Sequence, residues 1–194
     1  DSGRPTINSL LPFAYQIADL GRQWSVLVHS RMLTYAHILD LDTKFRALLS
    51  SLPIFLRPDP TLEQLPEVRQ EQAQRPYLAM HRLIVFEAVN QRLLVLHRDD
   101  MCRGHHDEKF AYSTRVAVDA ARTILSCRQQ IDNVHPAVQK HAAFRHHLFQ
   151  AAIVLSIHLL ELSHKAQGES QVAHQLRDDI ALIMNYLYGS NSLR

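Results

Sequence analysis

Apolar residues recur every three or four positions along most of this chain, which is the spacing of one face of an α-helix. A first such segment runs from Ile7 to Arg31, and a second runs from Leu33 to Leu52. The second should end before Pro53, because the residue that precedes a proline is pushed out of helical geometry. The expected inward face of the first helix comprises Leu10, Ala14, Ile17, Leu20, Trp24, Leu27 and Val28.

The stretch from Pro53 to Pro76 has a different character, because five prolines punctuate it. Such a stretch predicts a surface connection with at most one short helical turn. A domain boundary at this place is one interpretation, but neither flank looks self-sufficient. We therefore predict a single helical domain over residues 1–194 with one long proline-rich loop.

The rest of the chain predicts four more helices. They span Pro76–Arg98, Phe110–Ile131, Pro136–Lys165 and Ser170–Tyr188, with a polar loop over Asp99–Lys109. The helix that begins at Pro76 is apolar almost all round and is therefore expected to be central. In the next one, small residues lie along one side and would let a neighbouring backbone come close: Ala117, Ala120 and Ala121. Six helices and almost no strand signal predict an all-α, irregular bundle.

Composition narrows the functional classes. The chain has only 5 Gly among 194 residues, which disfavours a glycine-rich phosphate loop. Its net charge is only +2, and arginines are scattered singly, as at Arg31, Arg46, Arg82 and Arg122. Direct contact with nucleic acid normally requires a basic stripe, so we expect none from this segment.

Two further features concern the context of the chain. Cys102 and Cys127 are too few for a disulfide-built fold. The chain begins at Asp1 without a charged and then apolar leader, so we expect an internal piece of a larger protein. The apolar stretch Leu148–Leu162 is about 15 residues long where a membrane span needs about 20, which favours a buried helix.

The 13 histidines raise the question of a metal site. The nearest arrangement is His158, Glu161 and His164, which would spread over about 120° of a helix surface, too wide for one ion. The adjacent pairs His105–His106 and His146–His147 point in different directions on a helix or lie in a loop. Neither cysteine has a second cysteine at zinc-site spacing. We therefore predict no metal ligands in this chain.

Catalytic patterns are equally scarce. Paired carboxylates occur at Asp40 with Asp42, Asp99 with Asp100 and Asp178 with Asp179. The last two pairs lack the third acid of a magnesium-binding motif, and Asp40 and Asp42 would lie about 200° apart on a helix and could not share an ion. Nucleophile elbows and dinucleotide fingerprints are missing too. We predict that the chain is not an enzyme and has no catalytic residue, while its ligand-binding residues stay unknown at this stage.

One structural pairing is predicted. Arg98 ends an apolar helix, and Asp40 and Asp42 lie within another. Arginine is well suited to a partly buried, two-pronged pairing with a carboxylate. We predict that Arg98 pairs with Asp40 or Asp42 as a structural clamp; the alternative is that Arg98 emerges into water.

Three stretches, in this order, resemble the fungal-specific transcription factor domain, also called the middle homology region of binuclear zinc-cluster transcription factors. The first is Tyr35–Asp42 followed by Leu52-Pro53, and the second is Leu94–Arg98 followed by Ser113 and by Ala120–Leu125. The third is Phe149–Leu155. Asp99 departs from the pattern, since the family usually has a proline after the His-Arg pair.

The resemblance implies a nuclear regulatory domain that controls transcription by RNA polymerase II. DNA recognition and zinc would belong to an N-terminal zinc cluster that this chain lacks, and the chain itself would bind no cofactor. Expected partners are proteins of the transcription machinery. Dimerisation and a small-molecule effector are also compatible with the resemblance, whereas nucleic acid and membrane are not expected partners. The alternatives are a helical ligand-binding or scaffold module, or a helical enzyme with an unrecognised site.

Overall fold

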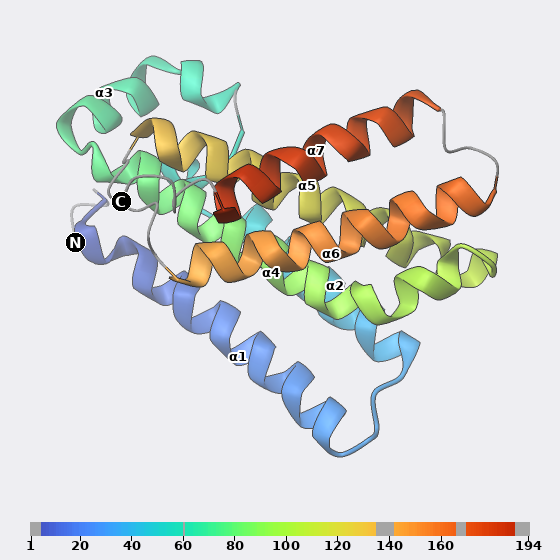
Figure 1. Ribbon diagram of the computed structural model, residues 1–194. Helices are drawn as coiled ribbons and strands as arrows, with labels where there is room; N and C mark the ends of the chain where they lie inside the picture. The colour runs from blue at the N-terminus through green and yellow to red at the C-terminus, as the bar shows by residue number, and fades with distance from the viewer. Residues whose placement is uncertain (1–4, 60, 135–141, 166–169, 189–194) are drawn as a thin grey trace. The chain divides into compact units, whose positions relative to one another are not determined.

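The computed structural model describes residues 5–59, 61–134, 142–165 and 170–188. Over these ranges the chain is built from helices without a strand, so the all-α prediction is confirmed. The α-helices are α1 (Leu11–His29), α2 (Tyr35–Ser51), α3 (Pro66–Gln74), α4 (Tyr77–Gly104), α5 (Ala111–Val134), α6 (Ala142–His164) and α7 (Gln171–Tyr188) (Figure 1). Short 3-10 turns lie at Ile7–Leu10, Ile54–Leu56, Leu62–Gln64 and Glu108–Phe110.

The chain forms two compact units, Asp1–Arg92 and Leu93–Arg194. The division falls inside α4 and not in the proline-rich connection. The single domain over residues 1–194 stays a prediction.

In the first unit, α2 is the best-buried of the two N-terminal helices. Thr34 caps its start: the Thr34 hydroxyl accepts a hydrogen bond from the His37 backbone N–H at 3.4 Å, and the His37 ring accepts one from the Thr34 N–H at 3.3 Å. Such reciprocal bonds satisfy donors that a helix start leaves open. The buried face of α2 carries Ile38, Leu41, Asp42, Phe45 and Leu48.

Helix α1 is less buried than its apolar pattern predicts. Ile17 is its one buried residue. Of the other residues on the expected inward face, Leu10, Leu20, Trp24 and Leu27 are half-buried, and Ala14 and Val28 are exposed. Apolar spacing identified the helix correctly but overstated how much of its face is covered.

The proline-rich connection contains more helix than predicted. Its last third forms the nine-residue helix α3, which begins at Pro66 and buries Val68 at 2% exposure. Proline is well placed at a first helical position because its backbone has no N–H to satisfy. The rest of the connection, as described up to Asp59 and from Thr61, consists of two 3-10 turns and irregular chain.

In the second unit, α6 packs against both α5 and α7. The predicted small residues of α5, Ala117, Ala120 and Ala121, are all buried where neighbouring helices pack. Helix α6 is only partly the buried helix that its sequence suggested. Leu148, Ala151, Ala152, Val154 and Leu155 are buried, whereas Phe149, Ile153 and Leu160 are exposed.

The C-terminal end of α4 corrects the sequence analysis. The helix was expected to end at Arg98 but continues to Gly104. Met101 is fully buried, and the Asp100 carboxylate accepts a hydrogen bond from Arg103 at 2.7 Å within the added turn. The buried Met101 and the ion pair between Asp100 and Arg103, three residues apart, stabilise this turn. The sequence predicted a loop here because Asp99 and Asp100 are both acidic.

Among the described helices, none combines the length and hydropathy that crossing a membrane requires. Cys102 is exposed, Cys127 is buried, and the two do not form a disulfide.

Candidate functional site

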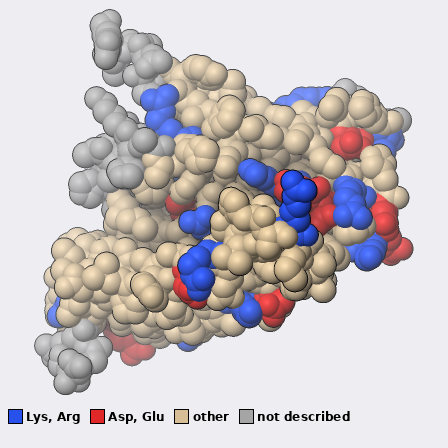
Figure 2. Space-filling view, turned by 90° about the horizontal axis from the view of Figure 1, so that it is seen from below, with Lys and Arg blue, Asp and Glu red and all other residues tan. Residues whose placement is uncertain are grey.

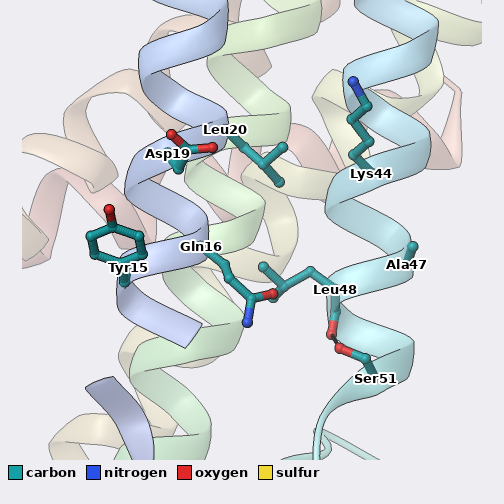
Figure 3. Close-up of a pocket in the computed structure, with 8 residues that line it drawn as sticks. All are labelled: Tyr15, Gln16, Asp19, Leu20, Lys44, Ala47, Leu48 and Ser51. Atoms are coloured by element: carbon teal, nitrogen blue, oxygen red, sulfur yellow. Dashed lines mark hydrogen bonds between the residues drawn. The ribbon is translucent and has the colours of Figure 1, made fainter. Parts of the chain in front are cut away.

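The first unit contains a cleft of about 450 Å³ between α1 and α2. Gln16, Leu20 and Leu48 point toward one another across it, whereas the ring of Tyr15 lies on the far side of α1 (Figure 3). Lys44, Ala47 and Ser51 complete the α2 wall. The cleft is wide open to solvent.

The charged groups of this cleft have partners on their own helices. Asp19 accepts hydrogen bonds from Arg22 at 2.8 Å and from Gln23 at 2.9 Å. The bonds from Arg22 and then Gln23 hold the pKa of the Asp19 carboxyl below its usual value. Lys44 forms an ion pair with Asp40 at 2.8 Å. A ligand that recruited either charge would have to compete with these local pairs.

The second unit contains a smaller groove of about 360 Å³ between α4 and α6. The residues of α4 that line it are Leu94, Arg98, Asp99, Met101 and Cys102, and all of these except Asp99 are spaced so that they share one face of the helix. From α6 its wall includes Ile153, Val154 and Ile157. Leu94, Met101 and Val154 are buried and form its apolar floor, while Cys102 is exposed at its edge.

Arg98 is the basic side chain of this groove. Its side chain is 42% exposed, and its Nε lies 3.4 Å from Oδ1 of the neighbouring Asp99. Because the Asp99 side chain is 78% exposed, water screens this ion pair, and exposed ion pairs contribute little to the free energy of unfolding. The Arg98 guanidinium therefore stands at the rim of an apolar groove without a tightly held local counter-ion.

The proposed clamp concerns the same arginine. Asp42 is buried and accepts a hydrogen bond from Arg46 at 2.8 Å, and Asp40 is paired with Lys44. Arg98 belongs to the second unit, and both aspartates belong to the first. The clamp stays a prediction.

A histidine pair in the second unit was missed by the sequence analysis. His158 Nδ1 lies 3.2 Å from His105 Nε2, with the two rings 5.0 Å apart. His106 Nε2 lies 3.3 Å from Glu161 Oε2, and the Lys165 ammonium donates to the His105 carbonyl. Sequence spacing could not reveal the pair, because 53 residues separate its members.

Both histidines of the pair have a lowered pKa, and among the described residues the pair does not form part of a metal site. Burial, followed by the charges of His105, Arg122 and Lys165, lowers the pKa of His158 to about 4. Burial also lowers the pKa of His105. Within the described residues no group of three potential ligands could hold a metal ion, and the arrangement His158, Glu161 and His164 is not assembled.

Residues that carry the family resemblance meet in the core of the second unit. His97 Nδ1 lies 2.9 Å from Ser113 Oγ, and both residues are fully buried. The Tyr112 ring stands edge-on to the His97 ring at 5.7 Å. One turn further along α4, the Met101 carbonyl accepts a hydrogen bond at 2.8 Å from the hydroxyl of Thr114, the residue after Ser113. These motif positions therefore fasten α4 to α5.

Charges of both signs are interspersed on the face of the protein that Figure 2 shows. On the face in Figure 2, lysine and arginine side chains lie beside aspartate and glutamate side chains, and large areas carry neither. Many basic residues are held in short-range pairs, as in Arg22–Asp19, Lys44–Asp40 and Arg122–Asp179. The face in view therefore does not present a basic stripe among its described residues.

Comparison with curated proteins finds two relatives of a single kind. The chain is 26% identical over 131 residues to the probable transcription factor lepB of Aspergillus flavus, covering 66% of this chain and 23% of that protein. It is 27% identical over 146 residues to the Agnestins biosynthesis cluster transcription factor AgnL11 of Paecilomyces divaricatus, covering 74% of this chain and 20% of that protein. The chain thus matches about a fifth of the length of these relatives. No known family and no solved structure matches the chain.

Proposed function

We propose that this chain is a regulatory region of a fungal zinc-cluster transcription factor and that it controls transcription by RNA polymerase II without contacting DNA. The observation that carries the proposal is the likeness to two proteins named as fungal transcription factors, which extends over two thirds to three quarters of the chain. The ordered resemblance of three stretches, the second of which contains the buried pair His97 and Ser113, supports the same assignment.

The role away from DNA is supported by charge. DNA binding gains affinity from each phosphate that a basic residue neutralises, which favours clustered lysines and arginines. Here the net charge is +2, and on the face in Figure 2 the basic residues lie among acidic ones. On this proposal, DNA recognition and zinc belong to a separate zinc cluster of six cysteines, and the protein acts in the nucleus through partners of the transcription machinery.

A tethered reporter tests the regulatory role. The chain would be inserted between a heterologous DNA-binding domain and an activation domain in budding yeast, beside an equally long unrelated helical insert at equal protein level. A regulatory region that restrains an activation domain lowers reporter output relative to that insert. Equal output from the two fusions would contradict the proposal.

The separation from DNA has its own measurement. Fluorescence anisotropy of a labelled duplex would be followed as purified chain is added at about 150 mM salt, where nonspecific binders have dissociation constants of roughly 1–100 µM. The proposal predicts no rise in anisotropy in that range. Binding with a steep salt dependence would place DNA contact in this chain.

A further inference from the structure

We infer that the groove between α4 and α6 is a binding site for a small amphipathic carboxylate, with the acid on Arg98 and the apolar body along Met101 and Ile153. This inference goes beyond the proposed regulatory function, and its test uses the purified chain without DNA or transcription. The groove lies wholly within the second unit.

The shape and lining of the groove favour a small molecule with an apolar body. Its volume of about 360 Å³ falls within the range of small-molecule sites, roughly 300–1,000 Å³. The floor is apolar and well buried, because Leu94 and Met101 are fully buried and Val154 is 2% exposed. Ile153 is 44% exposed and Ile157 is half-buried, so a ligand that covers their apolar surface gains binding free energy by removing that surface from water.

The charge of the rim selects the ligand's head group. Arg98 carries a planar guanidinium that can hold a carboxylate through two parallel hydrogen bonds. Asp99 also lines the groove, but its side chain is 78% exposed and its carboxylate lies 3.4 Å from Arg98, so water screens its charge and it competes weakly for the guanidinium. In the α1–α2 cleft, by contrast, Lys44 and Asp19 hold closer partners at 2.8 Å. Charge complementarity therefore assigns an organic anion to the α4–α6 groove and not to the larger cleft.

Cys102 offers a readout inside the groove. It is exposed and lines the groove, whereas Cys127, the other cysteine of the chain, is buried. A thiol reagent such as 5,5′-dithiobis(2-nitrobenzoate) should therefore modify Cys102 first. A molecule seated on Met101 and Ile153 covers this thiol and slows its modification.

The experiment titrates decanoate against the rate of Cys102 modification in the intact chain. The inference predicts saturable protection by decanoate and much weaker protection by the uncharged decan-1-ol. Arg98→Gln should raise the decanoate concentration for half-protection about tenfold, the usual worth of a hydrogen bond to a charged group. Lys44→Gln removes the same charge from the other cleft and should change that concentration less than about twofold.

A second pair of variants tests the apolar part without risk to the fold. Ile153→Gln changes a half-exposed groove residue and should weaken protection, whereas Val172→Gln changes an equally exposed residue of α7 outside the groove and should not. Absence of protection at millimolar decanoate would overturn the inference. Equal weakening of decanoate protection by Lys44→Gln and Arg98→Gln would also overturn it. A third contradicting result is a Cys102 thiol that is shielded without decanoate and more strongly at higher protein concentration, because a second copy of the chain would then cover the groove.

Discussion

Ser113 shows how one buried hydroxyl connects a sequence motif to stability. Its Oγ lies 2.9 Å from His97 Nδ1 in a fully buried pair. Ser113→Ala removes one side of that bond and leaves a buried imidazole nitrogen without this partner. We predict a loss of about 1–3 kcal/mol in the free energy of unfolding, measured by urea denaturation. Thr123→Ala is a matched control, because the Thr123 hydroxyl is exposed and bonds only within its own helix; an equal loss there would refute the special role of Ser113.

His158 predicts a dependence of stability on pH. Its pKa is lowered from the ordinary value of 6.5 to about 4, so the unfolded chain takes up a proton at a higher pH than the folded one. The stabilisation is therefore complete above pH 6.5 and is lost as the pH falls toward 4. Since the ring is half-buried, we expect about 1–2 kcal/mol of this dependence from His158.

The measurement compares wild type with His158→Gln by urea denaturation between pH 7 and pH 4.5. The variant removes the titrating ring that faces His105, Arg122 and Lys165. Its free energy of unfolding should fall less steeply with acidification than that of wild type. Parallel curves would mean that His158 is not held neutral by its surroundings.

At the scale of helices, the two glycines of the described helices predict opposite results. Gly104 ends α4, and a methyl group there would collide with the Thr114 hydroxyl and the Phe110 carbonyl. Gly104→Ala should therefore destabilise the protein by about 1–3 kcal/mol.

A methyl group at Gly21 in α1 would have the Arg92 side chain as its nearest neighbour, at an ordinary 3.4 Å. Gly21→Ala should stabilise by about 0.5–1 kcal/mol, because alanine favours the helix. Thermal denaturation of both variants checks the pair, and shifts of the same sign would contradict it.

The clamp and the groove make different demands on Arg98. As a clamp with Asp40 or Asp42, Arg98 would hold two helices together, and Arg98→Met should lower the melting temperature. As an anion-binding residue at a half-exposed rim, it would leave stability nearly unchanged and lose affinity for decanoate. An unchanged melting temperature refutes the clamp. Lys44→Met is the control: it breaks an exposed ion pair with Asp40, and its shift in melting temperature shows how much the loss of a surface charge changes stability.

Sequence periodicity predicted helix positions well because burial repeats with the helical period. The described ends of helices α2, α5 and α7 lie within three residues of their expected bounds. The expectations that failed depended on long-range packing. Met101 is buried because other parts of the chain pack around it, and this burial stabilises the last turns of α4. In the same way, the burial of Val68 stabilises α3. The start expected for α6 at Pro136 lies outside the described residues.

The candidate sites were harder to predict than the helices. Arg98 stands out in the sequence because it ends an apolar run, but the groove beside it depends on a helix far away in the sequence. Ile153 and Cys102 lie 51 residues apart in the sequence, on different helices, and neither is part of a chemical motif. The His105–His158 pair was invisible for the same reason. Local spacing reports which face of a helix is apolar, but not which faces meet.

The whole molecule raises the question of how closely its two compact units are coupled. The prediction of one domain means that a substitution in the second unit also destabilises the first. Trp24 is the chain's single tryptophan and lies in the first unit, so its fluorescence reports unfolding there. Ser113→Ala should then lower the midpoint of the Trp24 transition as much as that of the helical circular dichroism. A Trp24 midpoint that does not move would mean that the units unfold independently.

The most direct test of the account is an in-frame deletion of this segment from the chromosomal gene, with transcripts and promoter occupancy measured in the same strain at matched protein level. A regulatory region that does not touch DNA predicts altered transcripts of the target genes while the truncated protein still occupies their promoters. Loss of promoter occupancy, or an unchanged transcript profile, would contradict the account.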